Sequence, residues 1–233
     1  MSIRSSIEKY YGQIRGNLPL RDRSWEHCFG YFRRLTAGGV EADRHNAALQ
    51  VAFYLASWGM YRGSSFALQY DYTIHLGVVD CLLKSPGLAP LWRQEFGCTD
   101  SDLQLMPKIF EATEAIRRVY KPFAEALNKG VSDTLATKVL LGTFGCLPAC
   151  DELFTAGFRH SGFSFSCLNE NFVKRVFGFC RENFGELQDA QAKINESSPI
   201  HYPVMKLVDM HFWQIGYDIS NGKKRDAMPP NAE

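Results

Sequence analysis

Residues 41–58, EADRHNAALQVAFYLASW, are apolar on most of the circumference of a helix, and Gln50, Tyr54 and Ser57 form the only polar stripe. A helix of this kind is buried on nearly all sides. We therefore expect it to lie at the centre of a core. Its apolar part is interrupted by polar side chains and is shorter than the roughly 20 residues that span a bilayer, so we expect no membrane contact.

The three-to-four-residue period recurs on both sides of this stretch. After Thr99–Ser101, which can cap a helix, apolar positions continue from Leu103 to Leu127, with Pro122 predicting a kink or break. A second long amphipathic helix is predicted from Asn169 to Ile194. Because alternation typical of strands is brief, the sequence predicts an all-α protein with one globular domain of seven to nine helices.

Glycine and proline residues mark the expected boundaries of the helices and of the domain. Residues 1–220 form the predicted helical domain, with a possible sub-boundary at 129–132, next to Gly130. The following helix is expected to begin after Ser132 or Asp133 and end near Phe144, and Pro148 is expected to start a short helix. The last helix is predicted to end near Tyr217, and the polar segment 221–233 to be a disordered tail.

Composition narrows the functional classes. The 233 residues include 26 Lys and Arg against 25 Asp and Glu, a net charge of +1, so any nucleic-acid contact has to be local. Seven cysteines occur without a CxxC pair, and the N-terminus lacks the apolar centre of a signal peptide. These features favour a cytoplasmic, reduced protein, and no motif indicates a metal ion or another cofactor.

The break between residues 58 and 65 is a candidate anion site. It joins two apolar helices and places Arg62, Ser64 and Ser65 where the second helix, predicted to end near Lys84, is expected to begin. Free N–H groups at a helix start favour an anion, and an arginine pairs with phosphate or carboxylate. The alternative is that a serine only caps the helix and that Arg62 is an ordinary surface residue.

Asp71 and His75 follow at a spacing of four residues, which places both side chains on one face of a helix. A histidine oriented by a carboxylate serves as a general base or a metal ligand. An ordinary hydrogen-bonded pair is the alternative. No HExxH or Glu-x-x-His pattern supplies further metal ligands.

The last helix is predicted to have two apolar-rich faces. The second face carries Tyr202, Lys206, Asp209, Trp213 and Tyr217, and the first carries Val204, Leu207, Val208, His211, Phe212 and Ile215. Two tyrosines and a tryptophan are unusual on a solvated face. This second face is therefore expected to pack against another helix or to form a surface for a ligand or partner.

Two segments resemble parts of helix-hairpin-helix base-excision glycosylases: residues 137–151, TKVLLGTFGCLPACD, and residues 208–216, VDMHFWQIG. In that superfamily a lysine near the start of a helix and a later aspartate serve catalysis. The resemblance assigns these roles to Lys138 and Asp151. The sequence departs from the pattern because the two residues are closer than usual and residues 142–147 lack the Leu-Pro-Gly-Val-Gly hairpin.

Residues 57–66, SWGMYRGSSF, and 145–151, GCLPACD, are also similar to segments of uncharacterised bacterial proteins, which favours a bacterial or phage-linked origin. Three hypotheses of function follow. The first is a helical module that binds a nucleotide or a nucleic-acid backbone at Arg62, Ser64 and Ser65. The second is a glycosylase-like enzyme that acts on DNA through Lys138 and Asp151, and the third is a structural or interaction protein that uses the Trp213 face. The sequence does not indicate an oligomeric state.

Overall fold

In the computed structural model, which describes residues 2–14, 20–39, 43–92, 95–96 and 99–226, every regular element is a helix. The α-helices are α1 (Ile3–Ile14), α2 (Ser24–Thr36), α3 (Arg44–Ser57), α4 (Leu76–Lys84), α5 (Asp100–Leu103), α6 (Met106–Glu125), α7 (Asp133–Thr143), α8 (Glu152–His160), α9 (Glu170–Glu182), α10 (Phe184–Asn195) and α11 (Val204–Asp226). Four short 3-10 helices are η1 (Arg21–Arg23), η2 (Phe66–Gln69), η3 (Tyr72–His75) and η4 (Pro86–Leu91). The prediction of an all-α fold is confirmed, but the described residues contain eleven α-helices rather than seven to nine.

The additional helices arise because two long predicted helices are divided. Thr99 caps α5 as expected, but a turn at Gln104 and Leu105 separates α5 from α6. Asn169 caps α9, and Asn183 separates α9 from α10. Pro122 was expected to kink or break a helix, but α6 continues past it to Glu125.

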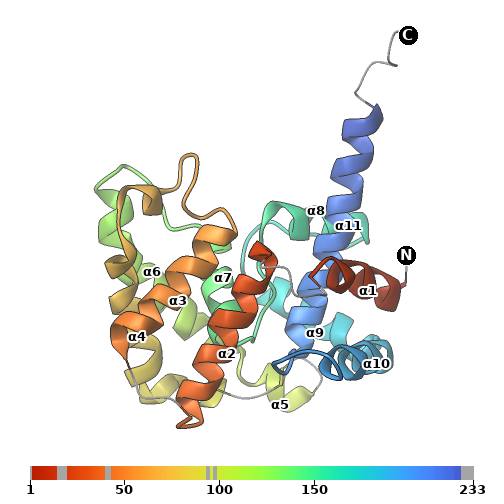
Figure 1. The fold of residues 1–233 in the computed structure, drawn as a ribbon, viewed down its shortest axis with the longest axis horizontal. Coiled ribbons are helices and arrows are strands. Elements are labelled where there is room, and N and C mark those ends of the chain that lie inside the picture. The colour runs from red at the N-terminus through yellow and green to blue at the C-terminus, as the bar shows by residue number, and fades with distance from the viewer. Residues whose placement is uncertain (1, 15–19, 40–42, 93–94, 97–98, 227–233) are drawn as a thin grey trace.

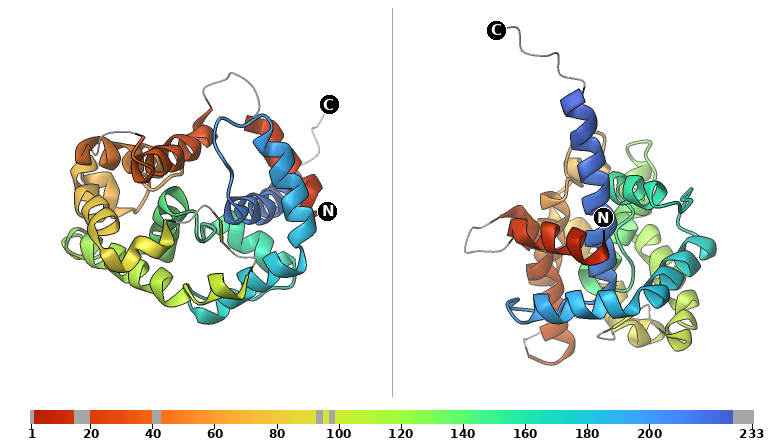
Figure 2. Two further views of the ribbon diagram at one scale, coloured as in Figure 1. Left: turned by 90° about the horizontal axis from the view of Figure 1, so that it is seen from below. Right: turned by 90° about the vertical axis from the view of Figure 1, so that its right-hand side faces the viewer.

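The centre of the fold consists of α7 and α11, which the other helices surround in the left view of Figure 2. Residues 135–143 of α7 are all buried, as are residues 202–214 in and before α11. The expectation that α3 is the central helix is wrong, because Leu49 and Phe53 are 47% and 54% exposed. One face of α3 packs on α2 and α4, and Tyr54, assigned to a polar stripe, lies on the buried face.

Helix α11 crosses α8 at a very short distance, on the right of Figure 1. A Cβ atom added to Gly157 would lie 1.9 Å from the carbonyl oxygen of Phe212. One added to Gly216 would lie 1.9 Å from the carbonyl oxygen of Leu153. Both positions therefore need glycine, and the crossing fixes the start of α8 relative to the middle of α11.

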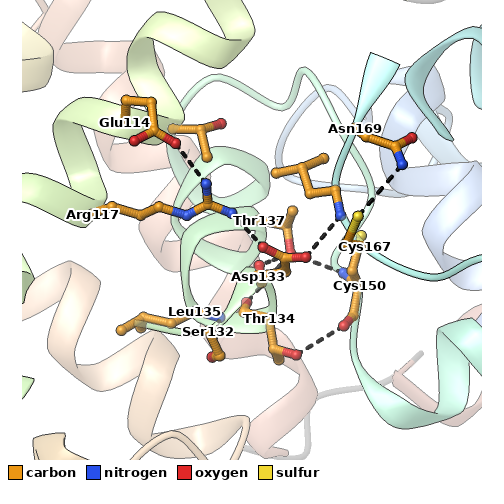
Figure 3. Close-up of polar contacts among 12 residues, drawn as sticks. Glu114, Arg117, Ser132, Asp133, Thr134, Leu135, Thr137, Cys150, Cys167 and Asn169 are labelled. Carbon is orange, nitrogen blue, oxygen red and sulfur yellow. Dashed lines mark hydrogen bonds and ion pairs between the residues drawn. The ribbon is translucent and has the colours of Figure 1, made fainter. Parts of the chain in front are cut away.

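The segments on both sides of residues 129–132 are joined by Asp133 at the start of α7 (Figure 3). One carboxylate oxygen of Asp133 forms an ion pair with Arg117 of α6, and the other accepts a hydrogen bond of 2.7 Å from the backbone N–H of Leu168. These contacts connect α6, α7 and the segment before α9. Residues near 130 therefore form a turn between packed helices.

The final helix extends further than the sequence predicts, because α11 ends at Asp226 instead of near Tyr217. Its last turns project away from the other helices (Figure 1). Residues 221–226, expected to belong to a disordered tail, are thus helical, and the rest of the expected tail lies outside the described residues. None of the described helices has the length and apolar content that a membrane crossing requires.

Candidate functional site

The second face of α11 is buried against Tyr10 of α1, Trp25 of α2 and Trp58, which follows α3. Tyr202, Lys206 and Asp209 are at most 5% exposed and Trp213 is 7% exposed, whereas Tyr217 at 37% reaches solvent. Of the two expectations for this face, packing describes most of it. The packing nevertheless encloses a lysine and an aspartate, which is unusual for a helix interface.

Lys206 lies inside a set of aromatic rings. Its Nζ atom donates a hydrogen bond of 2.7 Å to Oδ2 of Asp209. The same Nζ is 5.2 Å from the ring centres of both Tyr10 and Trp25, and 5.6 Å from that of Trp58. A buried ammonium is stabilised by such ring faces and by the carboxylate beside it.

A second lysine and aspartate face the same tryptophan. Nζ of Lys138 donates to Oδ2 of Asp151 over 3.1 Å and lies 5.2 Å from the centre of the Trp58 ring. The two residues that the glycosylase resemblance selects are therefore in direct contact. We call Lys138, Asp151, Lys206, Asp209 and Trp58 the two-lysine site.

The connection between α7 and α8 positions both carboxylates. Asp151 ends this connection and caps α8, where its Oδ1 accepts from the N–H of Phe154 over 3.0 Å. The N–H of Ala149 donates to Oδ1 of Asp209 over 3.0 Å. The expectation that Pro148 begins a helix is wrong, because α8 begins only after the Asp151 cap and the preceding backbone bonds to side chains instead.

This connection is buried, so its backbone polar groups need partners inside the protein. Cys150 lies beside Thr134 and Thr137 of α7 in Figure 3. Its N–H donates to Oγ1 of Thr137 over 2.9 Å, and its carbonyl accepts from Oγ1 of Thr134 over 2.8 Å. Gly145 starts the connection with φ +67°, a conformation that favours glycine.

Electrostatics around the site keep the neighbouring phenols neutral. Burial raises the pKa of Tyr10 and Tyr54 well above the usual value, and the nearby carboxylate of Asp209 raises both further. Neither phenol therefore supplies a base at neutral pH.

Solvent reaches the two pairs unequally. The side chain of Asp151 is 17% exposed, whereas Lys138, Lys206 and Asp209 are between 3% and 7% exposed. Trp58 is partly exposed, and the guanidinium of exposed Arg21 is 6.0 Å from its ring centre. The approach to the site is therefore at Asp151 and Trp58, with a cation beside it.

The proposed anion loop differs from its predicted geometry. The fourth helix expected to begin at Ser64 and Ser65 is instead η2, which starts at Phe66 and has four residues, followed by η3 and α4. Oγ of Ser65 donates to the carbonyl of Met60 over 2.5 Å. Arg62 and Ser64 are exposed, and the Arg62 side chain lies over Gly59, directly after Trp58.

Asp71 and His75 do not form the expected pair. Asp71 is exposed and accepts hydrogen bonds from Thr73 at the start of η3. His75 is buried and lies 2.6 Å from the hydroxyls of both Tyr61 and Tyr120. The pairing was wrong because the two residues precede α4, at the start and end of the 3-10 helix η3, where a spacing of four does not place them on one face. Burial lowers the pKa of His75 to about 4.

The sequence interpretation gave no role to Trp58 within the loop 58–65, nor to Tyr10 and Trp25, whose rings face Lys206. A signal was present, because Lys138 is followed by the apolar residues VLLG and Lys206 lies within the otherwise apolar segment PVMKLV. A lysine in such a segment needs buried partners.

Among the described residues, no group of three His, Cys, Asp or Glu side chains could hold a metal ion.

Comparison of the chain with protein-family models, curated proteins and solved structures gives no match.

Proposed function

We propose that the protein is a glycosylase-like enzyme that forms a Schiff base between Lys138 and the sugar of a damaged or abasic nucleic acid. The observation that carries this proposal is the contact of 3.1 Å between Lys138 Nζ and Asp151 Oδ2 beside a partly exposed tryptophan ring. An enzyme of this class needs an amine, a carboxylate that exchanges a proton with it, and a surface for a planar base.

The chemistry assigns a separate role to each residue of the first pair. Asp151 takes a proton from the Lys138 ammonium, and the free amine attacks the aldehyde carbon of an abasic sugar. A C–N bond forms, and the carbonyl oxygen leaves as water after it receives the proton held by Asp151 and one proton from the attacking nitrogen. The product is an imine between Lys138 and the sugar, and borohydride reduces this imine to a stable secondary amine.

Exposed arginines supply the affinity for phosphate in this proposal. Arg21 lies beside the Trp58 ring. The side chain of Arg62 lies over Gly59, the residue that follows Trp58 in the chain. Guanidinium groups pair with phosphate oxygens in two-point contacts. The anion-binding hypothesis based on Arg62, Ser64 and Ser65 is thus retained as the substrate-holding part of the same function.

Borohydride trapping on an oligonucleotide with one abasic site tests the proposal. The wild-type protein should give a covalent complex, and peptide mapping should locate it on Lys138. Lys138→Arg keeps a cation beside Asp151 but removes the primary amine, so the complex should disappear. Lys9→Arg is the matched control, because Lys9 forms a surface pair of 2.7 Å with Asp218.

Absence of a trapped complex with the wild-type protein, over a panel of abasic and damaged oligonucleotides, would overturn the enzymatic proposal. If sulfate or an undamaged oligonucleotide still raised the melting temperature, and Arg62→Ala removed that rise, the protein would be a binding module. A complex mapped to Lys206 would assign the nucleophile to the other pair.

A further inference from the structure

A cavity of about 540 Å³ lies across α11 from Lys206 and Asp209. It is bordered by the start of α1, the end of α8, the junction of α9 and α10, and α11 itself. Helices α1 and α8 both pack on α11, on the right of Figure 1. The volume is within the range of pockets that hold small molecules.

His211 brings a buried ring nitrogen to this cavity. The residue is 5% exposed, and its ring stacks on that of Phe179 with ring centres 5.5 Å apart. Nδ1 lies 2.5 Å from Oγ of Ser6, whereas Nε2 has no hydrogen-bond partner in the described part of the chain. Nε2 is not among the fully enclosed atoms, so it borders the cavity. Buried His75 differs, because tyrosine hydroxyls pair with both of its ring nitrogens.

The contacts of Ser6 decide which ring nitrogen of His211 carries the hydrogen. The hydroxyl of Ser6 has one hydrogen and donates it to the carbonyl of Ile3 over 2.7 Å. The hydrogen between Oγ and Nδ1 therefore comes from the imidazole. Burial lowers the pKa of His211 to about 4, so the ring is neutral at pH 7. Nε2 is then an acceptor without a hydrogen.

The other polar groups of the cavity are mostly acceptors too. Oγ of Ser161 and the amide nitrogen of Asn183 each donate to the backbone carbonyl four residues earlier, over 2.9 Å and 2.8 Å. The Ser161 hydroxyl can then only accept from a ligand, and the amide oxygen of Asn183 is an acceptor as well. Ser2 and His160, which complete the uncharged polar lining, can donate or accept.

Two carboxylates also line the cavity. Asp218 is shared with Lys9, whose Nζ lies 2.7 Å from its Oδ1. Glu186 is exposed and forms no ion pair with any described residue. A ligand that matches this lining has to bring hydrogen-bond donors. An organic ammonium ion does so, because it has N–H donors and no acceptor.

We propose that this cavity is a binding site for an organic amine in its ammonium form. The ammonium donates to Nε2 of His211 and to the carboxylate of Glu186. The apolar body of the amine lies against Phe163, Phe179 and Ile215, which form the apolar part of the lining. The site is separate from the two-lysine site and does not depend on the proposed function.

Three probes with the same phenylethyl body but different head groups test the proposal: 2-phenylethylamine, 2-phenylethanol and 3-phenylpropanoate. At pH 7 the first is an ammonium ion, the second is a neutral alcohol with one donor, and the third has only acceptors. 2-Phenylethylamine should bind at least about tenfold more tightly than 3-phenylpropanoate, with 2-phenylethanol in between. Isothermal titration calorimetry on the full-length protein measures the three affinities.

Nitrogen NMR on full-length protein with ¹⁵N-labelled histidine locates the bound amine. In the free protein, the His211 ring should carry its hydrogen on Nδ1 and none on Nε2. 2-Phenylethylamine should move the Nε2 resonance upfield, because this nitrogen then accepts a hydrogen bond. The resonances of His75 should stay unchanged, since both of its ring nitrogens are already paired.

Two variants test the assigned contacts. His211→Phe keeps an aromatic ring but removes the acceptor, and should weaken 2-phenylethylamine binding by about tenfold. Glu186→Gln changes an exposed residue, so folding should not be affected, and should weaken binding by about threefold. Glu196→Gln is the matched control, because Glu196 is also exposed but does not line the cavity, and it should leave the affinity unchanged.

A His211 ring that carries its hydrogen on Nε2 in the free protein would overturn the inference, because Nε2 would then be a donor. Binding of 3-phenylpropanoate as tight as that of the amine, or an unchanged Nε2 resonance with the amine, would do the same. If His211→Phe does not fold, equal affinities of Glu186→Gln and Glu196→Gln would count as the contradicting result. Lys138→Arg should leave amine binding unchanged, so failure of the proposed function is a separate outcome.

Discussion

The two lysine–aspartate pairs face the same tryptophan but lie in different surroundings. Lys206 and Asp209 both belong to α11, are 2.7 Å apart, and have three aromatic rings around the ammonium. Lys138 and Asp151 come from α7 and the cap of α8 and are 3.1 Å apart, and among the described residues Lys138 faces the ring of Trp58 alone. Asp151 is also the most exposed of the four side chains.

This difference indicates a division of roles. The carboxylate of Asp209 binds both Lys206 and the N–H of Ala149, so the inner pair holds the connection before α8 in place. The outer pair differs in its carboxylate, because the side chain of Asp151 is 17% exposed, whereas Lys138 is as buried as Lys206. Under the proposed function, the Lys206 pair positions the connection and the Lys138 pair forms the Schiff base.

The largest effect that tests this comparison is expected for Lys206→Met. The substitution leaves the Asp209 carboxylate, 7% exposed, without its cation, and should lower the free energy of unfolding by about 3–5 kcal/mol. Lys138→Met should cost about 1–2 kcal/mol, because Asp151 is 17% exposed and lies at a helix N-terminus, which favours its charge. Urea denaturation measures both values.

The double variant Lys206→Met with Asp209→Asn is the control for the inner pair. It removes the isolated charge while the amide oxygen can still accept from Ala149, so it should recover part of the lost stability. Equal costs for Lys206→Met and Lys138→Met would contradict the assigned roles.

The second prediction concerns a substitution that moves α8, which Asp151 caps, relative to α11, which carries Lys206 and Asp209. Gly157→Ala places a Cβ against the backbone of Phe212, so α8 and α11 have to move apart, and stability should fall by about 3 kcal/mol, the upper part of the overpacking range. Asp151 should then shift relative to Asp209. Gly178→Ala in α9 is the matched control, because its Cβ meets no atom within 4 Å, and it should stabilise by about 0.5–1 kcal/mol.

Thermal denaturation compares the two alanine variants. If Gly157→Ala were as well tolerated as Gly178→Ala, the close crossing of α8 and α11 would be refuted.

The third prediction uses pH to separate buried histidines from the lysine pairs. Burial lowers the pKa of His75 and of His211 to about 4, against 6.5 for an ordinary histidine. Between these values the unfolded chain binds protons that the folded chain does not, so stability is complete above pH 6.5 and falls toward pH 4. The loss should be about 2–3 kcal/mol per histidine.

Urea midpoints measured from pH 7 to pH 4 give this loss, and His75→Gln should make the dependence shallower. Lys206→Met should shift the whole profile downward without changing its histidine part. A profile that is flat between pH 6.5 and 4 in the wild-type protein would contradict the neutral, buried state of both histidines.

Local signals explain where sequence interpretation succeeded. The helical period predicted the all-α class, and the caps at Thr99, Ser132 and Asn169 were predicted because a side chain bonds an N–H only three residues away. The prediction around Pro148 failed because Thr134 and Thr137 of the preceding helix, and Asp209 at 60 residues' separation from Ala149, bond the backbone of the connection. Asp71 and His75 were paired by a spacing that holds only in an α-helix.

The sequence by itself determined the helical class, most helix starts and the two lysines placed among apolar neighbours, because each depends on residues within one or two turns. Only the tertiary structure decided which helices are central, that Lys138 meets Asp151, and that Trp58 joins both pairs. Those contacts link α3, α7, α8 and α11 across up to about 150 residues, and they depend on the close crossing at Gly157 and Gly216. A linear pattern contains the residue types of such a site but not the packing that brings them together.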